Sequence, residues 1–286
     1  MVGSLATSPA IDLSGLPSPA VIAQPDFETR LAAKLATLLA QHPEFSALVE
    51  SDPAMKLLEA DCYDELVLAQ AFADAARGML LAYADGPRLD HLAALFAVVR
   101  MEGESDTALR QRVQLAPHSF SVAGPELAYV YHARSAHPQV ADATAVSPTP
   151  GQVVVTVLST EGDGVPSGEV LAAVEGVVAG DVRPLTDEVI VQGAALVDFA
   201  IEASLYVFAG PDQELIRQTA LASLEAHLAQ ARRLGRDVAR SALIAALHVA
   251  NVQRVELAQP AADIAIGAGE IGRVTATTVA IGGTVL

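Results

Sequence analysis

A long stretch of helical periodicity constrains the fold more than any other feature of the chain. Between Pro53 and Tyr83, apolar residues recur at spacings of three and four, which predicts one amphipathic helix. Asp52 suits its N-cap and Pro53 its first turn, because proline lacks the N–H that would go unpaired there. At 1.5 Å per residue, such a helix is a rod of about 45 Å. A rod with one apolar stripe needs partners along it, from its own neighbouring helices or from another chain.

Four residues of this stripe are our candidates for contact with a partner protein: Leu58, Cys62, Leu66 and Phe72. Cys62 is the only cysteine, so no intrachain disulfide is possible. A free thiol on an apolar helix face behaves as a small hydrophobic group, which disfavours a cysteine nucleophile. The sequence therefore predicts a packing role for this helix rather than a chemical one.

The hydrophobic pattern changes from helical to strand-like after about residue 147. Upstream, helical periodicity begins near Asp26 and breaks at His42, and after the long helix three shorter helices are expected from about residues 88, 105 and 125. Downstream, strands are expected at 153–158, 189–191, 197–208, 252–257 and from 272, with helices beginning near 166, 212 and 241. This order predicts an α+β fold in which a split βαβ, ferredoxin-like region follows the helices.

These patterns divide the chain into four parts. We expect an extended arm (1–25), a helical region (26–147), a ferredoxin-like α+β domain (148–260) and a C-terminal strand segment (261–286). The proline-rich arm is either a disordered tail or a strap lying on a neighbouring subunit. The final strand carries no charge after Arg273, and such a bare edge aggregates unless it is paired, which indicates a partner.

Net charge excludes several classes of partner. The 286 residues carry a formal net charge of -17, which disfavours binding to nucleic acid and to anionic membrane surfaces. The apolar run at 189–208 holds Asp198 and Glu202, each costing about 2.5–3.5 kcal/mol at the centre of a bilayer, so membrane insertion is not expected. The first four residues show no basic region ahead of an apolar core, so no signal peptide is expected either.

No motif in the chain carries a recognisable chemistry. Gly162 and Gly164 follow a strand, but the third glycine of a dinucleotide loop comes one place late and acidic neighbours disfavour phosphate, so the segment predicts a tight turn. His132 and His137 lie five apart without a cysteine pair, which disfavours a metal site. The abundant carboxylates do not single out an acid–base pair. We therefore expect no catalytic residue, no metal and no cofactor.

Two surface clusters are further candidates for protein contacts. Tyr129 and Tyr131 form a contact patch or simply divide between core and solvent. The basic residues Arg232, Arg233, Arg236 and Arg240 either complement a helix dipole or meet an acidic partner surface. Only Lys34 and Lys56 are lysines, and the other basic residues are arginines. Arginine serves protein interfaces better than lysine does, but a GC-rich genome explains the same preference for arginine.

Short motifs stand in a fixed order from about residue 52 onward. They are Leu81–Gly86 with Leu89–Leu92, Glu104–Asp106 with Arg110–Pro117, Ser121–Gly124, Tyr131–Ala133, Gly162–Ser167, Asp181–Asp187 and Val252–Val255. In this order and spacing the chain resembles the baseplate J-like family, the wedge subunits of contractile phage tails and tail-like bacteriocins. The family contributes no catalytic residue that could be transferred to this chain.

The resemblance implies a structural wedge subunit that is made in the bacterial cytoplasm and located in the tail baseplate. It implies a helical region that joins neighbouring wedge proteins in a bundle, and α+β parts that link wedges into a ring around the central spike. The expected partners are other baseplate wedge proteins, further copies of this chain, and sheath or tube adaptor proteins. Two alternatives from other classes are a tail-associated cell-wall-degrading enzyme and a cytosolic protein-binding module.

Overall fold

The computed structural model describes residues 11, 13–17, 19, 26–121, 124–180, 182–210 and 212–285. Its internal contacts divide the described chain into two compact units, Ile11–Val99 and Arg100–Leu286. The predicted extended arm falls mostly outside the described residues. Within it, Leu13–Gly15 form a single 3-10 turn, and the Leu16 carbonyl accepts a 2.8 Å hydrogen bond from the Tyr83 hydroxyl.

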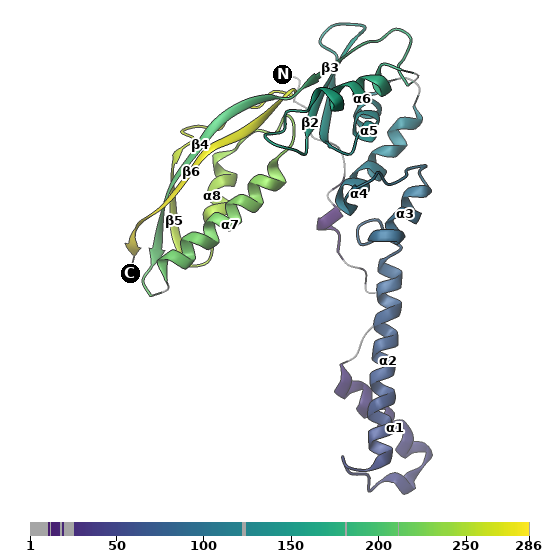
Figure 1. Cartoon of the computed structure of the whole chain (residues 1–286). Helices are drawn as coiled ribbons and strands as arrows, with labels where there is room; N and C mark the ends of the chain where they lie inside the picture. The colour runs from purple at the N-terminus through teal and green to yellow at the C-terminus, as the bar shows by residue number, and fades with distance from the viewer. Residues whose placement is uncertain are drawn as a thin grey trace. The chain divides into compact units, whose positions relative to one another are not determined.

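Helices make up the unit Ile11–Val99. They are α1 (Phe27–Gln41), the short 3-10 helix η2 (Pro43–Phe45), α2 (Pro53–Arg77) and α3 (Gly86–Ala94). The predicted start near Asp26 is confirmed: its side chain accepts a hydrogen bond from the Thr29 N–H, a standard N-cap. Figure 1 shows α1 lying beside α2.

The long helix is shorter than predicted. α2 begins at Pro53 as expected but ends at Arg77, and the residues up to Tyr83 form turns. Gly78 follows the last helical residue, and a Cβ atom built on it would lie 2.6 Å from Cδ of Arg88. The chain therefore packs the Arg88 side chain closely against the backbone at the position where the helix ends.

The first part of the unit Arg100–Leu286 is a three-stranded sheet with helices packed on it. Its elements are α4 (Asp106–Leu115), η3 (Ala116–Phe120), α5 (Glu126–Ala136), β1 (Val140–Val146), β2 (Gln152–Ser159), α6 (Gly168–Val178) and β3 (Glu188–Gly193). The strand order is β1-β2-β3; β1 is antiparallel and β3 parallel to β2, with α6 in the crossover. Buried residues of α5, α6 and the strands, including Tyr129, Val155 and Val174, form one core.

A second three-stranded sheet follows in the same unit. Its elements are β4 (Ala195–Phe208), α7 (Gln213–Ala231), α8 (Arg240–Leu247), β5 (Val252–Gln259) and β6 (Glu270–Val285). The order is β5-β4-β6, with β5 antiparallel and β6 parallel to the central β4. In Figure 1 both helices lie along one face of this sheet, where Leu224 and Leu243 join Ile201 and Leu205 in its core.

A buried ion pair joins the start of this unit to α4. The Arg112 guanidinium donates to both carboxylate oxygens of Glu104, at 2.6 and 2.7 Å, and also to the Ser135 hydroxyl at 3.3 Å. Both charged side chains are almost fully buried. Ser105 is the N-cap of α4, as the sequence predicts: its hydroxyl oxygen accepts a hydrogen bond from the Ala108 N–H.

The two sheets share a small core. Leu158, Ala194, Leu234 and Ile271 are buried together, and Ala194 is the single residue between β3 and β4. The Thr144 hydroxyl on β1 donates to the Ala268 carbonyl just before β6, at 2.7 Å. The chain thus leaves one sheet and enters the next without a linker.

The α+β class with an N-terminal helical region and a long helix is confirmed, but the strands are arranged differently from a ferredoxin-like sheet. They form two sheets, each with one parallel crossover and one antiparallel strand. Two strands account for the difference: β1, which was not predicted, pairs with β2, and β6 pairs with β4 in the second sheet. The structure also groups α4 and α5 with the first sheet, so the described unit begins at Arg100, whereas the sequence predicts a boundary after residue 147.

The turn between β2 and α6 yields a testable expectation. The predicted tight turn at Gly162 is present, and both Gly162 and Gly164 have positive φ, at 57° and 102°. A Cβ atom on Gly164 would lie 2.6 Å from Cδ1 of the buried Leu158, whereas one on Gly162 meets nothing within 4 Å. Gly164→Ala should therefore combine backbone strain of about 1–3 kcal/mol with overpacking of about 1–3 kcal/mol.

The matched control for that substitution is Gly162→Ala, which should lose only about 1–2 kcal/mol from the left-handed backbone. Urea unfolding followed by circular dichroism measures both changes in the free energy of unfolding. Equal losses for the two variants would show that Leu158 gives way without cost.

Candidate assembly surfaces

Helix α1 covers one side of α2. Cys62 on that side is fully buried, and its thiol lies 3.7 Å from the Phe27 carbonyl oxygen, to which it donates. Arg30 pairs with Glu65 at 2.5 Å, and Lys34 pairs with Glu65 at 2.9 Å and with Asp61. The hydrogen bond from Lys34, and then that from Arg30, lower the pKa of Glu65. The N-terminal half of α2 therefore has its apolar stripe covered within the chain.

The rest of α2 and the turn after it expose large apolar side chains. Phe72 is 59% exposed, Leu68 58% and Met79 75%, and Val67 and Leu80 are also exposed. We call these five residues the exposed α2 face: Val67, Leu68, Phe72, Met79 and Leu80. Leu68 and Phe72 are four residues apart, so they lie on one side of α2, and Met79 and Leu80 follow in the turn after it.

The length of α1 explains where the exposed α2 face begins. The first residues of α1 lie level with Cys62 and Glu65, as the contacts of Phe27 and Arg30 show, and the two helices run antiparallel. Among the described residues, α1 therefore offers no cover to α2 beyond about residue 69. Ala73, further along the helix, is buried, but the large side chains of Leu68 and Phe72 remain exposed.

The structure separates the four candidates on this helix. Cys62 is buried, Leu58 and Leu66 are half-buried on the side of α1, and Phe72 is exposed. Val67, Leu68 and Met79 join Phe72 but were not among the candidates. The signal that would have found them is a second set of apolar residues at spacings of three and four, offset from the first.

The tyrosine candidates lie on α5. Tyr129 is buried and its hydroxyl donates to the Asp187 carboxylate at 2.8 Å; burial, with that hydrogen bond, raises the pKa of Tyr129. Tyr131 is half-buried and packs edge-on against the His132 ring, with the ring centroids 5.3 Å apart. Tyr129 therefore serves the fold of this unit, and its role as a partner contact stays a prediction.

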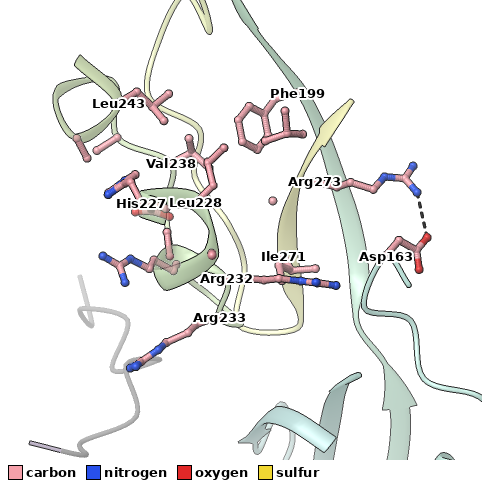
Figure 2. A pocket seen from close by; sticks show the side chains of 18 of the residues that line it. Asp163, Phe199, His227, Leu228, Arg232, Arg233, Val238, Leu243, Ile271 and Arg273 are labelled. Carbon is pink, nitrogen blue, oxygen red and sulfur yellow. Dashed lines mark hydrogen bonds and ion pairs between the residues drawn. The ribbon is translucent and has the colours of Figure 1, made fainter. Parts of the chain in front are cut away.

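The arginine candidates lie together at the end of α7. Arg232, Arg233 and Arg236 are exposed and line a cavity of about 490 Å³. Figure 2 shows Phe199, Val238 and Leu243 grouped on one side of this cavity, with Arg232 and Arg233 on the other. Arg240 lies apart from them: its guanidinium donates to the carbonyls of Leu257, at 2.8 Å, and Pro260. Within the described ranges, no three His, Cys, Asp or Glu side chains gather as metal ligands would.

Similarity to known proteins extends over nearly the whole chain. Three family models match in succession: the baseplate J-like N-terminal domain at residues 50–107, the central domain at 121–193 and the C-terminal domain at 199–280. Baseplate protein J of Escherichia phage P2 is 43% identical over 299 residues, which span 96% of this chain and 99% of that protein. The chain belongs to the baseplate J-like family.

Membership makes the chain a structural protein of the phage tail baseplate. The three baseplate J-like domains also correspond to features of the fold. The N-terminal domain contains α2 with its exposed face, the central domain contains the first sheet, and the C-terminal domain contains most of the second. In the part of the chain that the structure describes, no helix is long and apolar enough to cross a membrane.

Proposed function

We propose that this baseplate J-like protein is a wedge subunit, which joins a neighbouring baseplate protein through the exposed α2 face and has no catalytic activity of its own. The observation that carries this proposal is the exposed α2 face itself. Apolar surface in water is unfavourable by about 25 cal/mol per Å², and contiguous patches of it are typical of protein interfaces. An amphipathic helix with one side open is suited to packing into a groove or bundle of partner helices.

A second contact is supported by β6. Among the described strands, none pairs with the edge of β6 that faces away from β4, and residues 274–285 carry no charge. Unpaired backbone N–H and C=O groups along such an edge bind an added strand from another chain. Two different surfaces on one subunit suit a wedge that meets both other baseplate wedge proteins and further copies of itself in a ring around the central spike. Sheath or tube adaptor proteins are further partners in this proposal, in a phage or in a tail-like bacteriocin.

Immunogold electron microscopy of purified particles tests this proposal. A tag on this chain should place label at the distal end of the tail, and the purified chain should leave peptidoglycan intact. Label spread along the tail, or absent from particles, would contradict the wedge assignment. Release of peptidoglycan fragments by the purified chain would favour a tail-associated enzyme instead.

A further inference from the structure

The cavity at the end of α7 combines an apolar floor with a positively charged rim. Its floor includes the buried side chains of Phe199, Leu243 and Ile271, and its rim carries Arg232 and Arg233 (Figure 2). Arg236 also lines the cavity and belongs to the same basic rim. Arg273 also lines it, but this side chain is already bound to Asp198, at 2.6 and 2.8 Å, and to Asp163 at 3.1 Å. The cavity therefore offers apolar contact below and uncommitted positive charge above.

The three rim arginines differ from most other arginines of the chain. Arg30, Arg112, Arg217 and Arg273 all pair with carboxylates. Among the described residues, the Arg232 guanidinium donates only to the Gly162 carbonyl at 3.1 Å, that of Arg236 only to the Gln230 carbonyl at 3.5 Å, and Arg233 has no ion pair. None of the described carboxylates forms an ion pair with these three arginines. The nearby Asp142 is buried, which raises its pKa, and the charges of Arg134 and Arg233 partly offset that rise.

The dipole of α7 explains only part of this cluster. Positive charge at the C-terminus of a helix is stabilising by about 0.3–1 kcal/mol, and Arg232 occupies the C-cap of α7. The dipole acts within the last turn, so it does not explain why Arg236, beyond the helix, faces the same cavity. It also does not explain the second cavity beside the first.

That second cavity, of about 320 Å³, shares Arg232 and Arg233 with the first and adds Arg134 and Asp142. Arg134 is buried; its Nη2 donates to Gln111 Oε1 at 2.6 Å, but its Nε has no hydrogen-bond partner among the described residues. Asp142 already accepts hydrogen bonds from the backbone N–H groups of Ala143 and Leu234, at 3.0 and 3.2 Å. A buried donor without an acceptor is unfavourable by about 1–3 kcal/mol, so an incoming acceptor would be stabilised here.

We propose that these two adjoining cavities bind a carboxylate-bearing segment of another baseplate protein, with the carboxylate at Arg232, Arg233 and Arg134 and an adjacent apolar side chain on the Phe199 floor. Paired arginines bind carboxylates through charge-assisted, often bidentate hydrogen bonds. A single carboxylate beside an apolar group fits this site better than a polyphosphate, because the net charge of -17 repels nucleic acid. The site is separate from the exposed α2 face.

A defined peptide pair tests the site on the full-length chain. The probe is N-acetyl-Leu-Glu-amide, and its neutral counterpart is N-acetyl-Leu-Gln-amide. The readout is the NMR shift of the arginine side-chain Nε–H groups during titration. We expect the shifts of Arg232 and Arg233 to saturate with the Glu peptide in the millimolar range, and at least tenfold more weakly with the Gln peptide. Equal affinity for the two peptides would overturn the proposal, and so would tighter binding of a short single-stranded DNA.

Two variants separate the site from general charge effects. Arg233→Gln should weaken binding of the Glu peptide at least tenfold, because it removes one of the two arginines shared by both cavities. Arg217→Gln on α7 removes an equal charge, but Arg217 lines neither cavity and pairs with Glu214. This control should bind as the unsubstituted chain does; equal loss in both variants would point to long-range attraction only. The readout needs no partner protein, so its failure would leave the proposed function of the exposed α2 face standing.

Discussion

Replacing Leu68 by Glu and Phe72 by Lys should reduce incorporation of the chain into particles at least tenfold while leaving its own fold intact. Both side chains are more than half exposed, so their loss leaves no cavity. Glu and Lys at positions i and i+4 form a pair that supports the helix. Full burial of a large apolar side chain contributes about 2 kcal/mol, and these two are 58% and 59% exposed, so losing both would weaken the contact by about 2.3 kcal/mol, roughly fiftyfold.

Quantitative mass spectrometry of purified particles measures the incorporation, and circular dichroism of the isolated chain checks its helix content. The matched control is Gln70→Lys, which adds one charge on another side of α2 beside Asp74, its present hydrogen-bond partner at 2.7 Å. Normal incorporation of the double variant would show that the exposed α2 face meets no partner. Loss of incorporation in the control as well would show that any charge on α2 is harmful.

The second large effect is expected at the buried pair of Glu104 and Arg112. Arg112→Met leaves a carboxylate that is almost fully buried without its counter-charge, and removing one member of such a pair is destabilising by about 3–5 kcal/mol. Glu104→Gln in the same chain removes the stranded charge, so the double variant should recover at least half of that loss. Urea unfolding followed by circular dichroism measures all three chains.

An exposed pair is the control for this result. Arg217→Met breaks the contact with Glu214 on the surface of α7, where water solvates the remaining carboxylate, so stability should change little. If Arg112→Met changed the free energy of unfolding as little as this control, water would have to reach the Glu104 carboxylate after the substitution. Adding Glu104→Gln would then recover no stability.

Local signals in the sequence predicted individual elements well. Asp26 and Ser105 both cap helices through the side-chain hydrogen bonds that their residue types favour. Pro53 marks the first residue of α2, and the break at His42 is where α1 ends. These features depend on contacts within a few residues, so the sequence alone contains what decides them. The family resemblance, carried by motifs rather than by periodicity, was confirmed by the comparisons.

Non-local pairing was beyond the same reasoning. β1 has the sequence Val-Ala-Asp-Ala-Thr-Ala-Val, and alanine and aspartate are depleted in strands, so residue propensities did not predict a strand here. The strand is stabilised instead by pairing with β2 and by the core of the first sheet. Without β1, the four strands predicted within 148–260 suggested one ferredoxin-like sheet, with the final strand as a separate segment. The burial of Arg134 had no sequence signal, because its hydrogen-bond partner Gln111 lies 23 residues away on another helix. The arginine cluster was predicted, but the cavities that it lines were not.

The pairing of β4 with β6 has a mechanical consequence. The two strands run parallel over fourteen residue pairs, so the chain enters β4 at one end of the sheet and leaves β6 at the opposite end. Tension applied between Ala195 and the C-terminus therefore acts along the strands and loads the backbone hydrogen bonds of all these pairs together. A hairpin pulled from its open end would instead break them one after another. This half of the subunit is thus built to transmit a pull without opening, with β4 as the element that bears it.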